Sequence, residues 1–221
     1  MNANRETFFW HGASLCVARF SASAIAALPE ERAIVARDST TRQLEFAAGR
    51  GAARVAASAI TRGVLEPLSV GQFDEPVFPA GMVGSIAHAA GWAAAAVGSS
   101  SKFRAIGVDL DDARRITLAV APTIATPREL NAVVELGWAG CPDLAANFAF
   151  CAKEAFFKCQ CALTGIRDLS FLDVELAPST DRRYLLPRPH AEEVARACAG
   201  VYIDARSMGN FRLAIALAPV V

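Results

Sequence analysis

The sequence has no excess of charge of either sign, because its 22 basic residues match its 22 acidic ones. General nucleic-acid binding usually goes with a marked basic excess, so this balance argues against that class but not against a local basic pocket. No run approaches the roughly 20 uninterrupted apolar residues that cross a bilayer. His11 and Arg19 interrupt the apolar N-terminal stretch, which therefore lacks the features of a secretion signal. We expect a cytoplasmic protein with no nucleic-acid or membrane partner.

Paired cysteine motifs are also missing, although the chain has six cysteines. A disulfide framework is not expected in a chain of 221 residues without a secretion signal. Cys159 and Cys161 have no second pair nearby that would complete a zinc site. We therefore predict that the cysteines are small core residues. Apolar residues are abundant instead, at 53% against 20% charged, which indicates a globular protein with a substantial core.

Apolar periodicity predicts four helices and several strands. The helices are expected at 28–38, 40–65, 126–138 and 143–163, with Gly165 as the stop of the last one. The strands are expected at 13–20, 84–90, 91–98, 104–110, 171–178, 182–187, 201–208 and 211–220. Residues 66–81 are too rich in Pro and Gly for regular structure.

Strand, helices and strands follow one another once in each half of the chain. The helices and strands come in runs, so the predicted class is α+β. The join near residues 100–107 divides the chain into halves at 1–104 and 105–221, although we see no residue-level repeat between them.

Three carboxylates follow the predicted strand in "AIGVDLDDARR", residues 105–115. Residues two apart on a strand point the same way, so Asp109 and Asp111 project together while Leu110 faces the core. Asp112 points the other way or begins a turn. Two such carboxylates form half of an oxygen-ligand site that suits Mg²⁺. Alone, the pair fits a strand end with solvated acids better than a metal site.

Two further motifs are ambiguous when each is read alone. In "FCAKEAFFKC", residues 150–159, Glu154 and Lys158 are four apart on a helix, which also describes an ordinary surface ion pair. In "GMVGSIAHAAGW", residues 81–92, His88 lies in a strand of small residues that would let a ligand approach the backbone.

Taken together and in this order, the three motifs change the interpretation. G-S-I-x-H, then G-V-D-x-D, then F-x-A-K-E-A-x-x-K strongly resembles the 4′-phosphopantetheinyl transferases, and more narrowly the monomeric, Sfp-type class that includes enterobactin synthase component D. The resemblance implies two similar α+β subdomains that form a pseudo-dimer. It also implies a holo-carrier-protein synthase, which moves the phosphopantetheine arm of coenzyme A to a serine of an apo acyl or peptidyl carrier protein and releases 3′,5′-ADP.

The resemblance assigns Mg²⁺ to Asp109, Asp111 and Glu154, in the C-terminal half. Lys158 lies one helical turn after Glu154, where it would neutralise the pyrophosphate and its leaving group. Glu154 is the family-based candidate for the general base. Asp111 stands where Glu is usual, and being one methylene shorter it can reach Mg²⁺ through a water.

For coenzyme A, the resemblance assigns the 3′-phosphate to His88, Arg42 and Arg50, and the border of the adenine to Pro76. The preference of guanidinium for phosphate fits this role, although without the motif context a solvated helix face describes Arg42 and Arg50 equally well. Arg54 would then be the next exposed turn.

Two departures from the family pattern concern coenzyme A. Ala87 replaces a usual Ser or Thr, and Phe73 stands where a Lys is common. Contacts with the carrier are expected from apolar residues near 148–157 and from the loop at 114–128.

Two alternatives stay open. A protein that binds coenzyme A but has lost transfer activity would fit Ala87 and Phe73. A phosphatase of the haloacid-dehalogenase type would use the D-x-D pair, but it requires alternating βα units that the sequence does not predict. The sequence does not identify the carrier, or show whether acylated coenzyme A is accepted.

Overall fold

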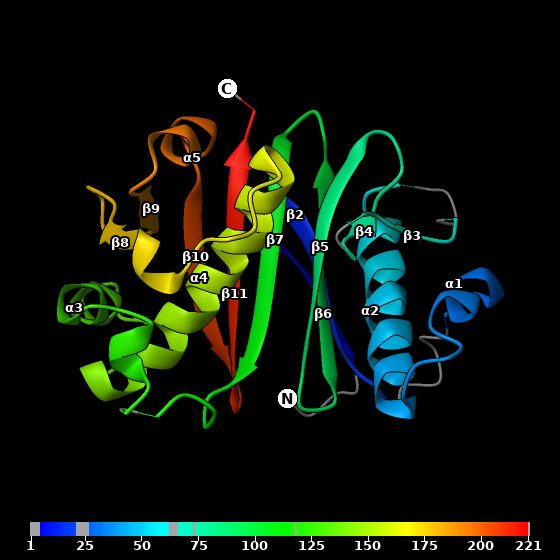
Figure 1. The fold of residues 1–221 in the computed structure, drawn as a ribbon, viewed down its shortest axis with the longest axis horizontal. Helices are drawn as coiled ribbons and strands as arrows, with labels where there is room; N and C mark the ends of the chain where they lie inside the picture. Colours follow the sequence, from blue (N-terminus) through cyan, green and yellow to red (C-terminus); the bar gives the residue numbers. More distant parts are fainter. Residues whose placement is uncertain (1–4, 21–26, 62–65, 73, 118, 221) are drawn as a thin grey trace. The chain divides into compact units, whose positions relative to one another are not determined.

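The computed structural model describes residues 5–20, 27–61, 66–72, 74–117 and 119–220. The described chain divides into two compact units (Figure 1). The N-terminal unit runs to Arg104 and includes Val220, and the C-terminal unit comprises Ala105–Pro219. Both contain helices and antiparallel sheet, so the predicted α+β class is confirmed. The assignment of the transferase halves to residues 1–104 and 105–221 stays a prediction.

The N-terminal unit is a four-stranded sheet with one long helix on it. The strand order is β1-β2-β6-β5. The strands are β1 (Arg5–Trp10), β2 (Ala13–Arg19), β5 (Met82–Ala89) and β6 (Trp92–Ser99). The other elements are α1 (Pro29–Ile34), α2 (Thr40–Ser58) and the two-stranded sheet of β3 (Ser69–Val70) and β4 (Pro76–Val77).

Small residues hold α2 close to this sheet. Ala52, Ala53 and Ala56 are fully buried against Cys16 and Ala95 of the strands. Ser39 caps the helix by accepting a hydrogen bond from the backbone N–H of Arg42 at 3.3 Å, which starts α2 where the sequence predicted. The helix ends at Ser58, earlier than the predicted end near Gly63, which lies outside the described residues.

The C-terminal unit is a five-stranded sheet in the order β7-β11-β10-β9-β8. The strands are β7 (Phe103–Asp112), β8 (Val174–Pro178), β9 (Leu185–Pro189), β10 (Tyr202–Met208) and β11 (Phe211–Pro219). The helices are α3 (Pro127–Glu135), α4 (Pro142–Thr164) and α5 (Glu192–Ala197), with 3-10 turns at Ala121–Thr123 and Phe171–Asp173.

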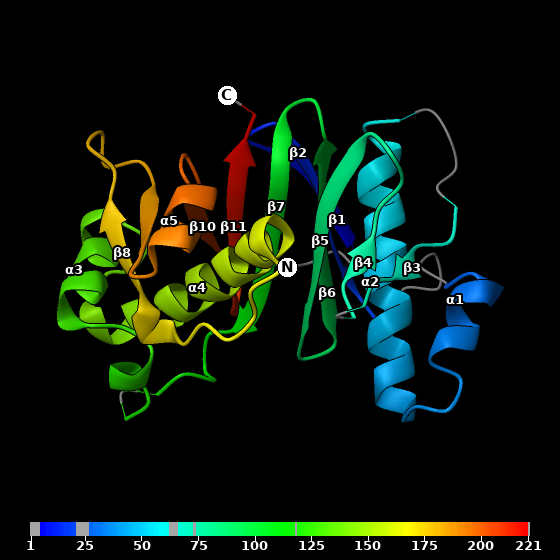
Figure 2. The same ribbon diagram turned by 45° about the horizontal axis from the view of Figure 1, so that its top comes forward.

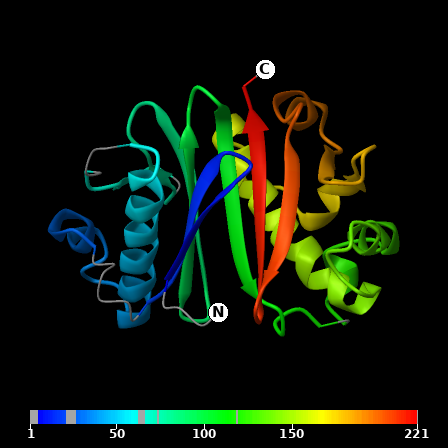
Figure 3. The ribbon, with the colours of Figure 1, turned by 180° about the vertical axis from the view of Figure 1, so that it is seen from behind.

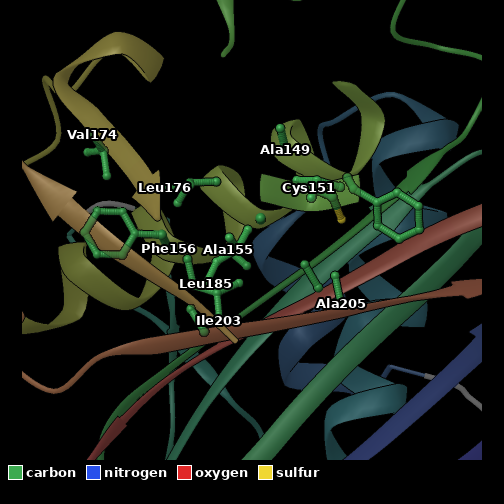
Figure 4. Packing of buried hydrophobic residues seen from close by; sticks show 14 of the residues in the cluster. Ala149, Cys151, Ala155, Phe156, Val174, Leu176, Leu185, Ile203 and Ala205 are labelled. Atoms are coloured by element: carbon green, nitrogen blue, oxygen red, sulfur yellow. The ribbon is translucent and has the colours of Figure 1, made fainter. Parts of the chain in front are cut away.

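Helix α4 is the centre of the C-terminal core. It runs from the side of α3 to β7 (Figure 2) and packs on β11 and β10, which lie in front of it when the unit is seen from behind (Figure 3). Figure 4 shows Ala155 and Phe156 of α4 among Leu176, Leu185 and Ile203 of the sheet. Gly165 ends the helix with a φ of 72°, a left-handed conformation that glycine adopts readily, as predicted.

A buried glutamate occupies an equivalent place in each unit. In the N-terminal unit Glu31 is the third residue of α1, after Pro29. Its carboxylate accepts hydrogen bonds from the backbone N–H groups of Leu28 (2.9 Å) and Leu68 (3.0 Å). Arg54 of α2 also binds this carboxylate, through an ion pair of 2.5 Å between its Nη1 and Oε1 of Glu31. The prediction that Arg54 is only an exposed turn is therefore wrong, because Arg54 neutralises a fully buried carboxylate.

The C-terminal unit repeats this arrangement around Glu129, the third residue of α3. Glu129 accepts from the backbone N–H groups of Thr126 (2.8 Å) and Leu176 (3.0 Å), and it pairs with Lys153 of α4 at 2.6 Å. In each network the buried glutamate is the last residue of a Pro-x-Glu sequence, at residues 29–31 and 127–129. The two halves thus share a residue-level correspondence that sequence analysis did not find.

Other departures from the predicted elements are small. Strand β1 and helix α5 were not predicted, and residues 66–81 contain the short strands β3 and β4 although no regular structure was expected there. All six cysteines are free, and four of them are buried, in agreement with the predicted core role. Every strand pair whose register is described is antiparallel, which disfavours the phosphatase alternative. Within the described residues, no helix is both long and apolar enough to cross a membrane.

Candidate functional site

Gly107 brings the acidic strand against α4. A Cβ atom at this position would lie 1.9 Å from the backbone oxygen of Ala155, so only glycine permits the approach. Asp109 and Asp111 follow Gly107 at intervals of two and therefore project from the same face of β7. The close packing places them beside the stretch of α4 that carries Glu154 and Lys158.

Lys158 pairs with the strand and not simply with its helical neighbour. Its Nζ donates to Oδ1 of Asp109 at 2.7 Å and to the backbone oxygen of Val108 at 3.1 Å. The alternative interpretation, an ordinary surface pair with Glu154, does not describe this lysine, because its ion pair is with Asp109. Lys158 fixes a positive charge next to the first strand carboxylate.

Asp111 carries a buried oxygen without a hydrogen-bond partner in the described part of the chain. The residue is 2% exposed, and its Oδ1 accepts from Nη1 of Arg115 at 3.3 Å. Its Oδ2 is buried and has no hydrogen-bond partner among the described residues. Burial raises the pKa of the carboxyl, Arg115 opposes the rise, and Asp109 adds to it. Such an oxygen is costly unless a cation or a proton satisfies it.

Glu154 belongs to the same electrostatic cluster. Burial raises the pKa of its carboxyl, and the negative charge of Asp109 raises it further. Lys158 and Arg115 oppose this rise. In the described ranges, no group of three His, Cys, Asp or Glu side chains is arranged to hold a metal ion. Mg²⁺ commonly takes only one or two carboxylates together with waters and substrate phosphates, so the donor set of Asp109 and Asp111, with the unpartnered Oδ2, fits that ion.

Two residues of the α4 motif were not predicted from the sequence, although they help to hold α4 in place. The buried thiol of Cys151 donates to the backbone oxygens of Asp109 (3.2 Å) and Arg212 (3.3 Å), and burial raises its pKa well above the ordinary value. Lys153 is fully buried and donates to the backbone oxygens of Ile124 (2.9 Å) and Phe171 (2.7 Å). Both lie on α4 beside Glu154, and only the motif itself could have drawn attention to them.

Arg42 and His88, which the resemblance assigned to the same phosphate, lie close together in the N-terminal unit. Nη1 of Arg42 lies 3.5 Å from Nε2 of His88, and Nδ1 of His88 lies 3.9 Å from Oε2 of Glu45. The imidazole is 35% exposed and thus open to a ligand. A guanidinium beside a partly exposed imidazole suits an anion such as a phosphate.

Arg50 is not on a solvated helix face. It is 5% exposed, its guanidinium lies 4.4 Å from the centroid of the Phe46 ring, and Nη2 donates to the backbone oxygen of Ser69 at 3.5 Å. Burial lowers its pKa to about 10, although the negative charge of Glu31 counteracts part of this shift. The hairpin that Arg50 contacts also carries Pro76.

Three further predictions have different outcomes. Phe148 was expected near the carrier, but it is 1% exposed because it belongs to the core under α4. Ala87 is buried in β5. Phe73 lies outside the described residues. The described predicted residues thus fall into two groups: Arg42, Arg50, Pro76 and His88 in the N-terminal unit, and Asp109, Asp111, Glu154 and Lys158 in the C-terminal unit.

Comparison with known proteins gives matches over both units. Residues 30–98 match a family model for the 4′-phosphopantetheinyl transferase N-terminal domain, and residues 105–216 match the model of the 4′-phosphopantetheinyl transferase superfamily.

Individual relatives agree with these models. The chain is 34% identical to 4′-phosphopantetheinyl transferase PptT of Mycobacterium tuberculosis, over 70% of this chain and 66% of that protein. It is 34% identical to 4′-phosphopantetheinyl transferase Svp of Streptomyces mobaraensis, over 73% of this chain and 67% of that protein. The matched part thus spans about two thirds of the length of these relatives. A solved holo-(acyl-carrier-protein) synthase from Bacillus anthracis in complex with CoA (3′,5′-ADP) aligns with 54% of this chain and 99% of that chain, at 24% identity and a TM-score of 0.39.

Proposed function

Because the chain belongs to the 4′-phosphopantetheinyl transferase superfamily, we propose that it transfers the 4′-phosphopantetheine arm of coenzyme A to a serine of an apo carrier protein. The observation that carries the proposal is the cluster on β7 and α4, where Lys158 pairs with Asp109 and a buried oxygen of Asp111 has no hydrogen-bond partner among the residues described. The proposed enzyme is a monomeric holo-carrier-protein synthase. Six free thiols fit a reducing compartment, for which we propose the cytoplasm.

The proposed step is a displacement at the β-phosphorus of coenzyme A. The serine Oγ forms a bond to this phosphorus, and the bond from the phosphorus to the bridging oxygen breaks. The bridging oxygen leaves with its electron pair on 3′,5′-ADP, and the serine proton passes to a base. Negative charge grows on the phosphoryl oxygens and on the leaving phosphate, so a fixed positive charge lowers the barrier. Lys158 supplies that charge, since Asp109 and the backbone oxygen of Val108 hold its ammonium in place.

Asp109 and Asp111 would hold Mg²⁺, with Glu154 as the third candidate ligand. A bound Mg²⁺ would neutralise negative charge on the pyrophosphate. Glu154 is also the proposed base, acting directly or through a water. Its raised pKa supports this role, because a carboxylate that binds a proton more tightly is a better proton acceptor.

Arg42 and His88 are proposed to bind the 3′-phosphate of coenzyme A. Their separation of 3.5 Å and the partial exposure of His88 support a shared anion site. Arg50 is assigned to the same phosphate, but its burial under Phe46 means that contact would require the Phe46 ring to move. Pro76 is proposed to border the adenine.

Mass spectrometry of apo carrier proteins tests the function. The protein is incubated with coenzyme A, Mg²⁺ and one carrier at a time, from fatty-acid, polyketide and nonribosomal peptide systems. We expect one carrier class to gain the mass of a phosphopantetheine group. Asp109→Ala should abolish the gain, whereas the matched Asp112→Ala should retain it, because Asp112 pairs with exposed Arg114 and not with Lys158.

If coenzyme A binds and no carrier gains mass, the second candidate, a binding protein without transfer activity, replaces the first. Ala87 favours this candidate, because its methyl side chain cannot offer the hydroxyl contact to the pyrophosphate. Transfer by Asp109→Ala at the parent rate would show that the metal assignment is wrong.

A further inference from the structure

Arg115 is a charged residue at the acidic cluster to which the proposed reaction gives no role. It follows β7 and reaches back to the strand, where its Nη1 donates to Oδ1 of Asp111 at 3.3 Å. Its guanidinium carbon lies 5.7 Å from the centroid of the Phe150 ring on α4. The side chain is 66% exposed. It therefore lies at the solvent edge of the cluster, between the strand and the helix.

Phe150, Glu154 and Lys158 are four residues apart on α4 and form one stripe of the helix. Arg115 lies over the first residue of this stripe, and Lys158 is the last. Each strand carboxylate thus has its own cation: Lys158 pairs with Asp109, and Arg115 pairs with Asp111. The cluster in this state has its charges largely compensated.

Lys158 is bound to the cluster more tightly than Arg115. Lys158 makes a bond of 2.7 Å to the carboxylate and a second bond, to a backbone oxygen, at 3.1 Å. The pair between Arg115 and Asp111 is 3.3 Å long, and the arginine is twice as exposed as the lysine, at 66% against 33%. Arg115 is therefore the cation that can leave the cluster at low cost.

We propose that Arg115 is a positioning residue that occupies Asp111 in the metal-free protein and moves away from it when the aspartates take up a divalent ion. The inference rests on the proposed function, because it requires a metal at Asp109 and Asp111. Without Arg115, a buried carboxylate whose Oδ2 already has no partner within the described ranges would also lose its side-chain partner, which is costly. With the ion in place, the guanidinium and the ion repel one another, and the exposed arginine can turn to solvent.

Competition between Arg115 and a divalent ion for Asp111 should lower the affinity for the ion by a measurable factor. A partly exposed ion pair favours the form in which Arg115 contacts Asp111 by roughly fivefold. An ion that must displace Arg115 therefore binds about fivefold more weakly than it would to an otherwise identical site without the arginine.

Titration of the full-length protein with Mn²⁺, without coenzyme A or carrier, measures this effect. Electron paramagnetic resonance of free Mn²⁺ gives the affinity for the parent, Arg115→Gln, Arg115→Lys and the matched control Arg114→Gln. Arg114 is adjacent, is 79% exposed and pairs with Asp112, so its substitution removes the same charge without freeing Asp111. We expect Arg115→Gln to bind Mn²⁺ about fivefold more tightly at low salt, with a smaller difference at high salt. Arg115→Lys and Arg114→Gln should stay within about twofold of the parent.

Three results would overturn the inference: Arg115→Gln binding Mn²⁺ no more tightly than the parent, Arg115→Lys binding it as tightly as Arg115→Gln, or Arg114→Gln giving the same gain. If any of these occurs while the parent protein binds Mn²⁺ and modifies a carrier, only the role of Arg115 fails. If the parent neither binds Mn²⁺ nor modifies any carrier, the proposed function fails as well.

Discussion

Substitution of Gly107 by alanine should separate the two elements that build the acidic cluster. The added Cβ would lie 1.9 Å from the backbone oxygen of Ala155 and 2.7 Å from the backbone nitrogen of Cys159, whereas real Cβ atoms essentially never come within 3.0 Å of such atoms. Neither neighbour is a flexible side chain that could turn aside. Helix α4 must therefore move away from β7 by about 1 Å, and Lys158 moves with it.

The size of the effect follows from this displacement. Overpacking a core of this kind costs about 2–3 kcal/mol of unfolding free energy. A displacement of about 1 Å at a catalytic group costs about 100-fold in rate. We expect Gly107→Ala to lower the urea midpoint, followed by the fluorescence of Trp138, which lies 6.3 Å from Phe148 of α4 (ring centroids). We also expect kcat for carrier modification to fall about 100-fold.

Gly140→Ala is the matched control, because an added Cβ there meets nothing within 4 Å. It should leave both stability and rate close to those of the parent. Gly107→Ala with the stability and rate of the parent would refute the claim that close packing of α4 on β7 forms the site. A loss of stability with an unchanged rate would show that the close packing stabilises the fold but does not determine the rate.

Three further predictions concern single side chains of the C-terminal unit. Lys158→Ala should lower kcat much more than it raises KM for coenzyme A, because the charge is needed on the leaving group; steady-state kinetics with the opposite pattern would make Lys158 a binding residue. Glu129→Ala should cost about 3 kcal/mol in urea unfolding, since it leaves the fully buried ammonium of Lys153 without its carboxylate; a loss below about 1 kcal/mol would contradict this account. In metal-free buffer, the raised pKa of Glu154 means that the folded protein binds this proton more tightly than the unfolded chain does. The associated stability is present below the ordinary pKa of 4.5 and is lost as the pH rises through the raised pKa. The parent should therefore lose unfolding free energy relative to Glu154→Gln from about pH 4.5 upward. Parallel curves of unfolding free energy against pH for the two proteins would contradict the raised pKa.

Local signals predicted most of the elements. The cap residue Ser39 and the stop at Gly165 mark helix ends through contacts within a few residues, so they can be read from a short window. Strand β1 was missed although its threonine and aromatic residues favour strands, because its apolar and polar residues do not alternate. The candidate site residues came from motif order, which indicates the chemistry but not the partner of each side chain.

The sequence by itself determined the α+β class, the motif residues and the alternation that directs Asp109 and Asp111 to one face of a strand. Only the tertiary structure decided that Lys158 pairs with Asp109, that Arg54 neutralises Glu31 and that Arg50 lies buried under Phe46. The pairs that join Lys158 to Asp109 and Arg54 to Glu31 connect residues more than twenty positions apart, and the burial of Arg50 depends on the hairpin of β3 and β4. Periodicity reports the direction of a side chain relative to its own element, whereas its partner and its burial depend on which other element packs against it.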